Sequence, residues 1–64
     1  MPISESERQR VIAVLDSMEE VVARAIIATM ESFAAWLARE LPTIFQRIRD
    51  RLAQLWDSVR SVFR

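Results

Sequence analysis

The side chains that most often carry out chemistry in proteins are missing from this chain of 64 residues. It has no histidine, cysteine, lysine or tyrosine, which leaves carboxylates and hydroxyls as the candidate bases and nucleophiles and excludes the common zinc ligand sets. No serine or threonine has a plausible partner base. The chain also has no glycine, so no glycine-rich loop can cradle a phosphate group. The sequence therefore predicts a protein that is not an enzyme and that needs no cofactor.

Acidic side chains gather at one point of the chain, where Asp16, Glu19 and Glu20 lie within five positions. A hard cation such as calcium binds carboxylate oxygens, but it needs six to eight oxygen ligands in all. The sequence does not show the other oxygen ligands that a calcium site needs. We therefore expect a solvated helix surface and no metal site.

The basic side chains are all arginines, and five of the nine lie in the last 23 residues. Arginines that flank an apolar helix face containing tryptophan are typical of helices that lie on a membrane surface. The same arginines could contact nucleic-acid phosphates, although Asp50 and Asp57 interrupt them and the whole chain has no net charge. The candidate contacts for a membrane or a phosphate are Arg47, Arg51, Trp56 and Arg60.

The elements that position these residues are expected to be helices, so the predicted fold class is all-α. Ser4 and Glu7 form a capping-box pattern that starts a helix. Pro42 is the one interior residue that a helix does not easily accommodate. We therefore predict a single small helical domain over residues 1–64, made of two helices at about 5–40 and 43–63 that are separated at Pro42.

An alternative divides the first helix. Ser17 and Glu20 form a second capping-box pattern, which predicts an extra break near Asp16–Ser17 and hence a three-helix bundle. The apolar pattern continues through Met18 without a change of phase, and this continuity favours the single long helix. No glycine or proline marks a turn there.

The two helices are expected to fold back on each other as an antiparallel hairpin through their large apolar side chains. The predicted intrachain packing residues are Val22, Ile26, Phe33, Leu37, Ile44, Ile48, Leu52, Leu55 and Val59. A helix of about 36 residues is about 54 Å long, whereas one of about 21 residues is about 31 Å long. The shorter helix would leave the N-terminal third of the longer one uncovered.

A second copy of the chain is the simplest cover for that uncovered surface. Small residues follow one side of the first helix, where they permit close approach of another helix. The predicted self-association residues are Val11, Val14, Leu15, Met18, Val21, Ala25, Ala28, Ser32 and Ala35. Residues 1–41 have a net charge of −3 and residues 42–64 a net charge of +3, so the halves attract each other. We expect a dimer that forms a four-helix bundle.

These observations predict a non-enzymatic module for self-association or protein interaction, such as a small adaptor or a structural component of a larger assembly, for example a virion. A further protein partner is compatible with it. The alternative is a membrane-surface protein that acts through the arginine-rich helix 43–64, with nucleic-acid binding less favoured. The sequence shows neither a secretion signal nor an apolar span free of charges, so we expect a cytoplasmic location or a place in an intracellularly assembled particle.

Overall fold

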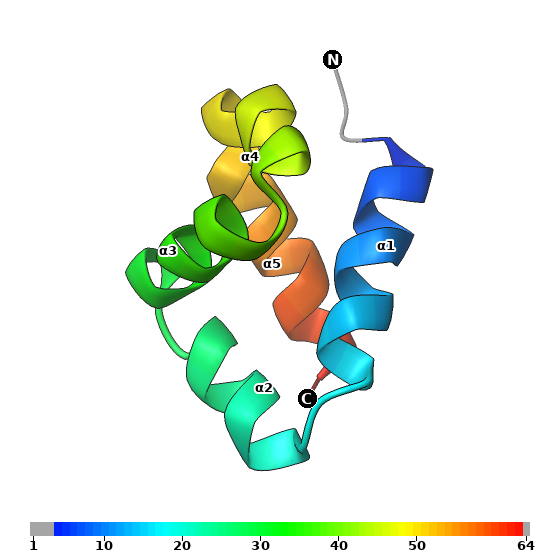
Figure 1. The fold of residues 1–64 in the computed structure, drawn as a ribbon, viewed down its shortest axis with the longest axis vertical. Coiled ribbons are helices and arrows are strands. Elements are labelled where there is room, and N and C mark those ends of the chain that lie inside the picture. The colour runs from blue at the N-terminus through cyan, green and yellow to red at the C-terminus, as the bar shows by residue number, and fades with distance from the viewer. Residues whose placement is uncertain (1–3, 64) are drawn as a thin grey trace.

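The computed structural model describes residues 4–63, and all regular structure within them is helical (Figure 1). The prediction of an all-α protein is confirmed. The elements are the helices α1 (Glu5–Asp16), α2 (Glu20–Ile27), α3 (Met30–Glu40) and α4 (Pro42–Ile48), a short 3₁₀ turn η1 (Arg49–Arg51), and the helix α5 (Leu52–Val62). The first helix starts where its capping residues predict, because the Ser4 hydroxyl accepts a hydrogen bond from the Glu7 amide at 3.4 Å.

The predicted continuous helix over residues 5–40 is wrong, and its first break lies where the alternative placed it. Helix α1 ends at Asp16, and Glu19 takes an extended conformation with φ −61° and ψ 142°. The Ser17 hydroxyl donates a hydrogen bond to the Val14 carbonyl at 2.7 Å. Because this local bond competes with continuation of the backbone ladder, it helps to end the helix without a glycine.

A second break, at Ala28 and Thr29, was not predicted. Thr29 is extended, and its hydroxyl accepts a hydrogen bond from the Ser32 amide at 3.0 Å, which starts α3 with a capping box. The Ser32 hydroxyl donates to the Ile26 carbonyl at 2.9 Å, so it also satisfies a carbonyl at the end of α2. The chain bends by 111° between α2 and α3.

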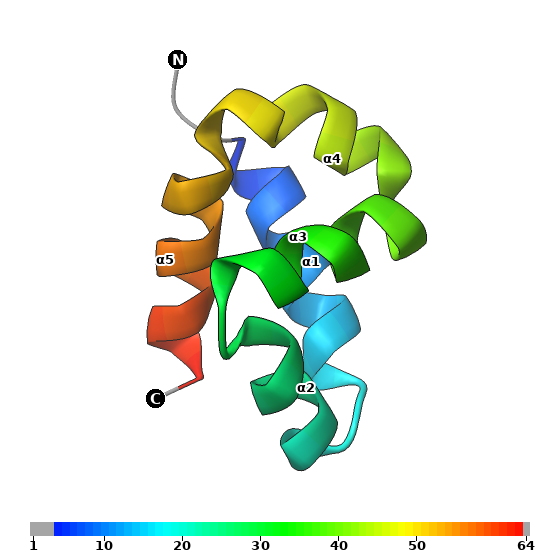
Figure 2. The same ribbon diagram turned by 90° about the vertical axis from the view of Figure 1, so that its left-hand side faces the viewer.

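The break predicted at Pro42 is present. Leu41 lies outside the helical region with φ −132° and ψ 61°, and Pro42 occupies the first position of α4, where its missing N–H costs no hydrogen bond. The predicted helix 43–63 is nevertheless not continuous, because Ile48 and Arg51 leave helical geometry on either side of η1. Figure 2 shows α4 running across the top of the molecule toward the upper end of α5.

The apolar residues form one core to which all five α-helices contribute. The buried core residues are Val11, Leu15, Ala23, Ile27, Phe33, Trp36, Leu37, Ile44, Ile48, Leu55 and Val59. Helices α1 and α5 lie side by side and run in the same direction (Figures 1 and 2). Helix α5 therefore covers α1. The expectation that the N-terminal third of the long predicted helix would lie uncovered is wrong. Two extra corners shorten the helices enough for α5 to reach α1.

The predicted intrachain packing residues divide into three groups. Phe33, Leu37, Ile44, Ile48, Leu55 and Val59 are at most 5% exposed, and Ile26 and Leu52 are half-buried. Val22 is a correction, because it is 46% exposed. The long-helix prediction assigned Val22 a phase that the break at Ser17–Glu19 changes, so that Ala23 points to the core in its place.

Candidate interaction surfaces

Helix α2 carries an apolar face that points away from the core. It buries Ala23 and Ile27, which are one turn apart. On a helix of about 3.6 residues per turn, Val21 and Ala25 lie on the opposite side, with Val22 next to them. Val21 is 71% exposed, Val22 is 46% exposed and Ala25 is also exposed. We call Val21, Val22 and Ala25 the α2 outer face.

Charged residues stand at only one edge of the α2 outer face. Glu20 and Arg24 are one turn apart and form an exposed ion pair at 3.4 Å. By the same helical geometry, they lie between the outer face and the buried stripe. An apolar strip that is bordered by one negative and one positive side chain is compatible with a second strip of the same composition.

The other predicted self-association residues do not lie on one surface. Val11 and Leu15 are fully buried in the chain's own core, and Val14 and Met18 are half-buried against it. Ala28 is exposed at the end of α2 and Ala35 is exposed on α3, but the 111° bend separates their faces. Ser32 is engaged in the capping box. Of the predicted stripe, only its α2 portion presents a run of exposed apolar residues.

Two of the candidate membrane or phosphate contacts meet beside the end of α2. The Trp56 indole N–H donates a hydrogen bond to the Ile27 carbonyl at 2.9 Å, which satisfies one of the carbonyls left free at the end of a helix. The Arg60 guanidinium lies 4.1 Å from the centroid of the Trp56 ring and also pairs with Asp57 at 2.6 Å. In this arrangement Trp56 joins α5 to α2.

The remaining two candidates lie elsewhere. Arg47 is on α4, and its guanidinium contacts the Glu7 carboxylate of α1 at 3.5 Å. Arg51 is half-buried in η1. The structure therefore brings Trp56 and Arg60 together and separates Arg47 from them on another helix.

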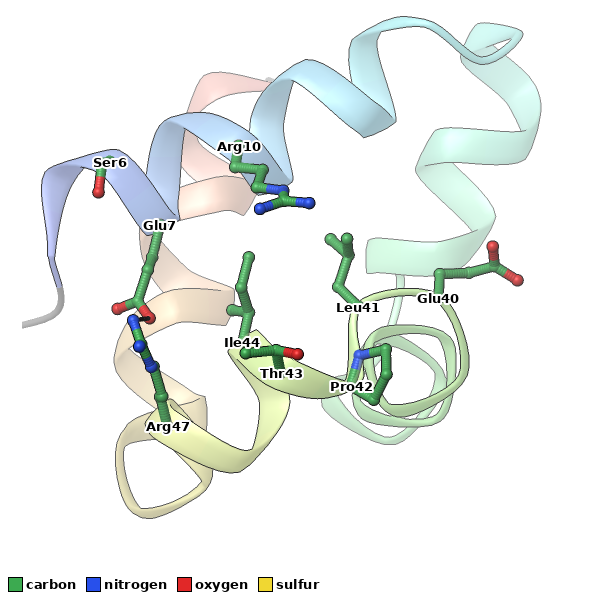
Figure 3. Close-up of a pocket in the computed structure, with 9 residues that line it drawn as sticks. All are labelled: Ser6, Glu7, Arg10, Glu40, Leu41, Pro42, Thr43, Ile44 and Arg47. Atoms are coloured by element: carbon green, nitrogen blue, oxygen red, sulfur yellow. Dashed lines mark hydrogen bonds and ion pairs between the residues drawn. The ribbon is translucent and has the colours of Figure 1, made fainter.

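A hollow of about 470 Å³ lies between the first turns of α1 and the corner that joins α3 to α4 (Figure 3). It is lined by Ser6, Glu7, Arg10, Glu40, Leu41, Pro42, Thr43, Ile44 and Arg47. The sequence did not predict this hollow, because the lining residues of α1 and α4 are more than thirty positions apart. The hollow arises where two packed elements diverge, and only the fold determines that point.

The acidic cluster is spread over a helix end, a linker and a helix start. Asp16 ends α1, Glu19 lies in the connection and Glu20 begins α2. Among residues 4–63, no group of three or more histidine, cysteine, aspartate or glutamate side chains is arranged to hold a metal ion. The cluster is exposed throughout.

A helix that crosses a bilayer must be both long enough and apolar enough. Within residues 4–63, no single helix meets both requirements, and α2 and α3 meet them only as a pair bent by 111°.

Comparisons of the chain with protein-family models, with curated proteins and with solved structures gave no match.

Proposed function

We propose that this protein is a non-enzymatic helical module that associates with a second copy of itself through the α2 outer face. The observation that carries the proposal is the 71% exposure of Val21 on this face. Six of the eight residues of α2 are apolar, yet only two are buried. A helix that is apolar on both sides is typically covered on both sides, and the single chain covers one.

A second copy suits this face because the face complements itself. In a two-fold contact the same patch meets its own image. If two α2 helices pack antiparallel and cross near Val22, Glu20 of each copy lies opposite Arg24 of the other. The small side chain of Ala25 permits a short distance between the helices. The apolar strip supports affinity, and the two reciprocal charge pairs fix the antiparallel direction.

The membrane-surface alternative relies on apolar residues that are already buried in the core. The apolar face of residues 43–63 contributes Ile44, Ile48, Leu55 and Val59 to the core. Contact with a bilayer through this face would require the bundle to open. Nucleic-acid binding is also less supported, because Arg47 and Arg60 each pair with an acidic side chain. An adaptor or a structural component of a larger assembly suits the geometry better.

The proposal is tested by sedimentation velocity over a concentration series of the 7.5 kDa chain. We expect a dimer that dissociates on dilution. Val21→Gln should weaken it, since losing most of one buried valine costs about 1 kcal/mol and a two-fold contact contains the residue twice, which raises the dimer Kd about 30-fold.

The matched control is Val62→Gln, because Val62 is 52% exposed on α5 and lies outside the α2 outer face. This variant should leave the Kd within about twofold. Circular dichroism verifies that both variants remain helical. A chain that stays monomeric at millimolar concentration would refute self-association, and equal effects of the two variants would refute the assignment to α2.

A further inference from the structure

The hollow between α1 and the α3–α4 corner contains an arginine without an ionic partner. Four charged side chains line the hollow. Glu40 pairs with Arg39 at 3.2 Å and points away from the opening, and Glu7 pairs with Arg47 (Figure 3). Arg10 forms no ion pair with any of residues 4–63, and its guanidinium points into the hollow.

The wall opposite Arg10 is apolar. Leu41, Pro42 and Ile44 line this side of the hollow, with Leu41 half-buried and Ile44 only 5% exposed. Figure 3 shows the side chains of Leu41 and Ile44 directed toward α1. A single positive group therefore faces a hydrocarbon surface across an open space, and the volume is typical of small-molecule sites, which span roughly 300–1,000 Å³.

The chemistry of a suitable ligand follows from these two walls. A guanidinium presents N–H groups in a planar fork that matches a carboxylate at two points. The apolar wall favours a ligand with a hydrocarbon portion next to its charge. Because Glu7 is paired with Arg47 and Glu40 with Arg39, Arg10 is the one charged group of the lining without an ion pair among residues 4–63, and a ligand with a single negative charge matches it. The site is thus suited to a singly charged anion with an apolar chain.

We propose that this hollow binds a small amphipathic monocarboxylate, with the carboxylate on the Arg10 guanidinium and the hydrocarbon chain against Leu41, Pro42 and Ile44. Two sources share this chemistry: a free medium-chain acid, and the C-terminal residue of a peptide when that residue is apolar. The inference does not depend on self-association, because the hollow and the α2 outer face are formed by different elements.

Titration of the ¹⁵N-labelled protein with sodium octanoate, followed by amide chemical shifts, tests the proposal. We expect shifts that saturate and that concentrate at Arg10, Leu41 and Ile44. Acetate has the charge without the chain, and octanol has the chain without the charge, so each should bind at least tenfold more weakly. Arg10→Gln should weaken octanoate binding tenfold or more, which is the effect of losing a hydrogen bond to a charged group.

Arg49→Gln is the matched control, because Arg49 is exposed and does not line the hollow, and the substitution removes the same charge. It should leave the affinity unchanged. A second arm uses an acetylated dipeptide that ends in leucine, with a free or an amidated C-terminus. Saturable, Arg10-dependent binding of octanoate alone assigns the site to free acids, and binding of the free-carboxylate peptide assigns it to chain ends. No localised shifts with either probe, or equal binding by the Arg10 and Arg49 variants, would overturn the proposal.

Discussion

Leu15→Ala separates the five-helix fold from a simple hairpin. Leu15 is fully buried beneath the contact of α1 with α5, whereas a long-helix hairpin would leave it uncovered. Truncating a fully buried leucine to alanine costs about 2–5 kcal/mol, because the transfer free energy is lost and a cavity remains. A chain of this length has a total unfolding free energy of roughly 3–10 kcal/mol. One substitution should therefore remove a large share of the stability.

The measurement is urea unfolding followed by circular dichroism at 222 nm, together with a thermal scan. At about 4–8 °C per kcal/mol for a domain of this size, the melting temperature should fall by at least about 8 °C. If the alanine variant does not fold, Leu15→Met supplies a milder change that should cost less than about 1.5 kcal/mol. Both experiments are run at two protein concentrations, because dimerisation would add a concentration-dependent contribution.

Val62→Ala is the control for Leu15→Ala, since Val62 is 52% exposed on the neighbouring helix. Its effect should stay within about 0.5 kcal/mol. If Leu15→Ala also costs less than about 0.5 kcal/mol, α1 is not packed against α5, and the arrangement in which α5 covers α1 is incorrect. A loss that appears only at protein concentrations at which the chain is dimeric would show that a second copy covers Leu15.

Two further expectations concern single contacts. Trp56→Phe keeps an aromatic ring but removes the hydrogen bond to the Ile27 carbonyl, so it should cost about 1–2 kcal/mol in urea unfolding. Arg60→Gln removes the stacked cation and the exposed ion pair with Asp57, and it should cost at most about 1 kcal/mol. A Trp56→Phe loss no larger than that of Arg60→Gln would mean that water replaces the indole donor. Hydrogen bonds from the Arg8 side chain, and secondarily from Gln9, hold the pKa of the Glu5 carboxyl below its ordinary value of 4.5. Because the folded-state pKa is lowered, the stabilisation is present above about pH 4.5 and is lost as the pH falls through the lowered value. In an NMR titration Arg8→Gln should return this pKa toward 4.5 and Arg24→Gln should not; a Glu5 pKa at or above 4.5 in the unmodified protein would contradict the contact.

Local signals in the sequence predict a helix start or end correctly where that boundary depends on a few neighbouring residues. The Ser4 cap starts α1, and Pro42 stands at the first position of α4. The Ser17–Glu20 pattern did mark a break, and the uninterrupted apolar spacing around Met18 was a misleading reason to prefer one long helix. Apolar spacing indicates which residues are expected to be buried, but it cannot exclude a corner that leaves those residues buried.

The break at Ala28–Thr29 could not be predicted from the neighbouring residues alone. Thr29 and Ser32 have a capping geometry, but serine at the third helical position is a weaker signal than the glutamate or glutamine of the usual capping box. Ser32 gains its role by donating to the Ile26 carbonyl of the preceding helix. That partner is in place only once the chain has turned, so the turn and the bond that stabilises it form together.

The surfaces, like the helices, could be predicted from the sequence only in part. The α2 outer face was partly predictable, because Val21 and Ala25 belonged to the expected self-association stripe. The rest of that stripe depended on a continuous helix, and it dispersed once α2 and α3 met at 111°. The hollow around Arg10 was not predictable, since its lining joins the start of α1 to the α3–α4 corner.

The sequence by itself determined that this protein is helical, that a helix ends before Pro42 and that histidine, cysteine, lysine and tyrosine are absent. These properties follow from residue type and short spacing, which act through local hydrogen bonds and backbone sterics. The tertiary structure alone decided that α1 is covered by α5, that Ala23 faces the core in place of Val22, and that Arg10 faces an apolar wall. Burial is a property of the whole chain, because each helix can hide its apolar face only against elements whose positions the other corners set.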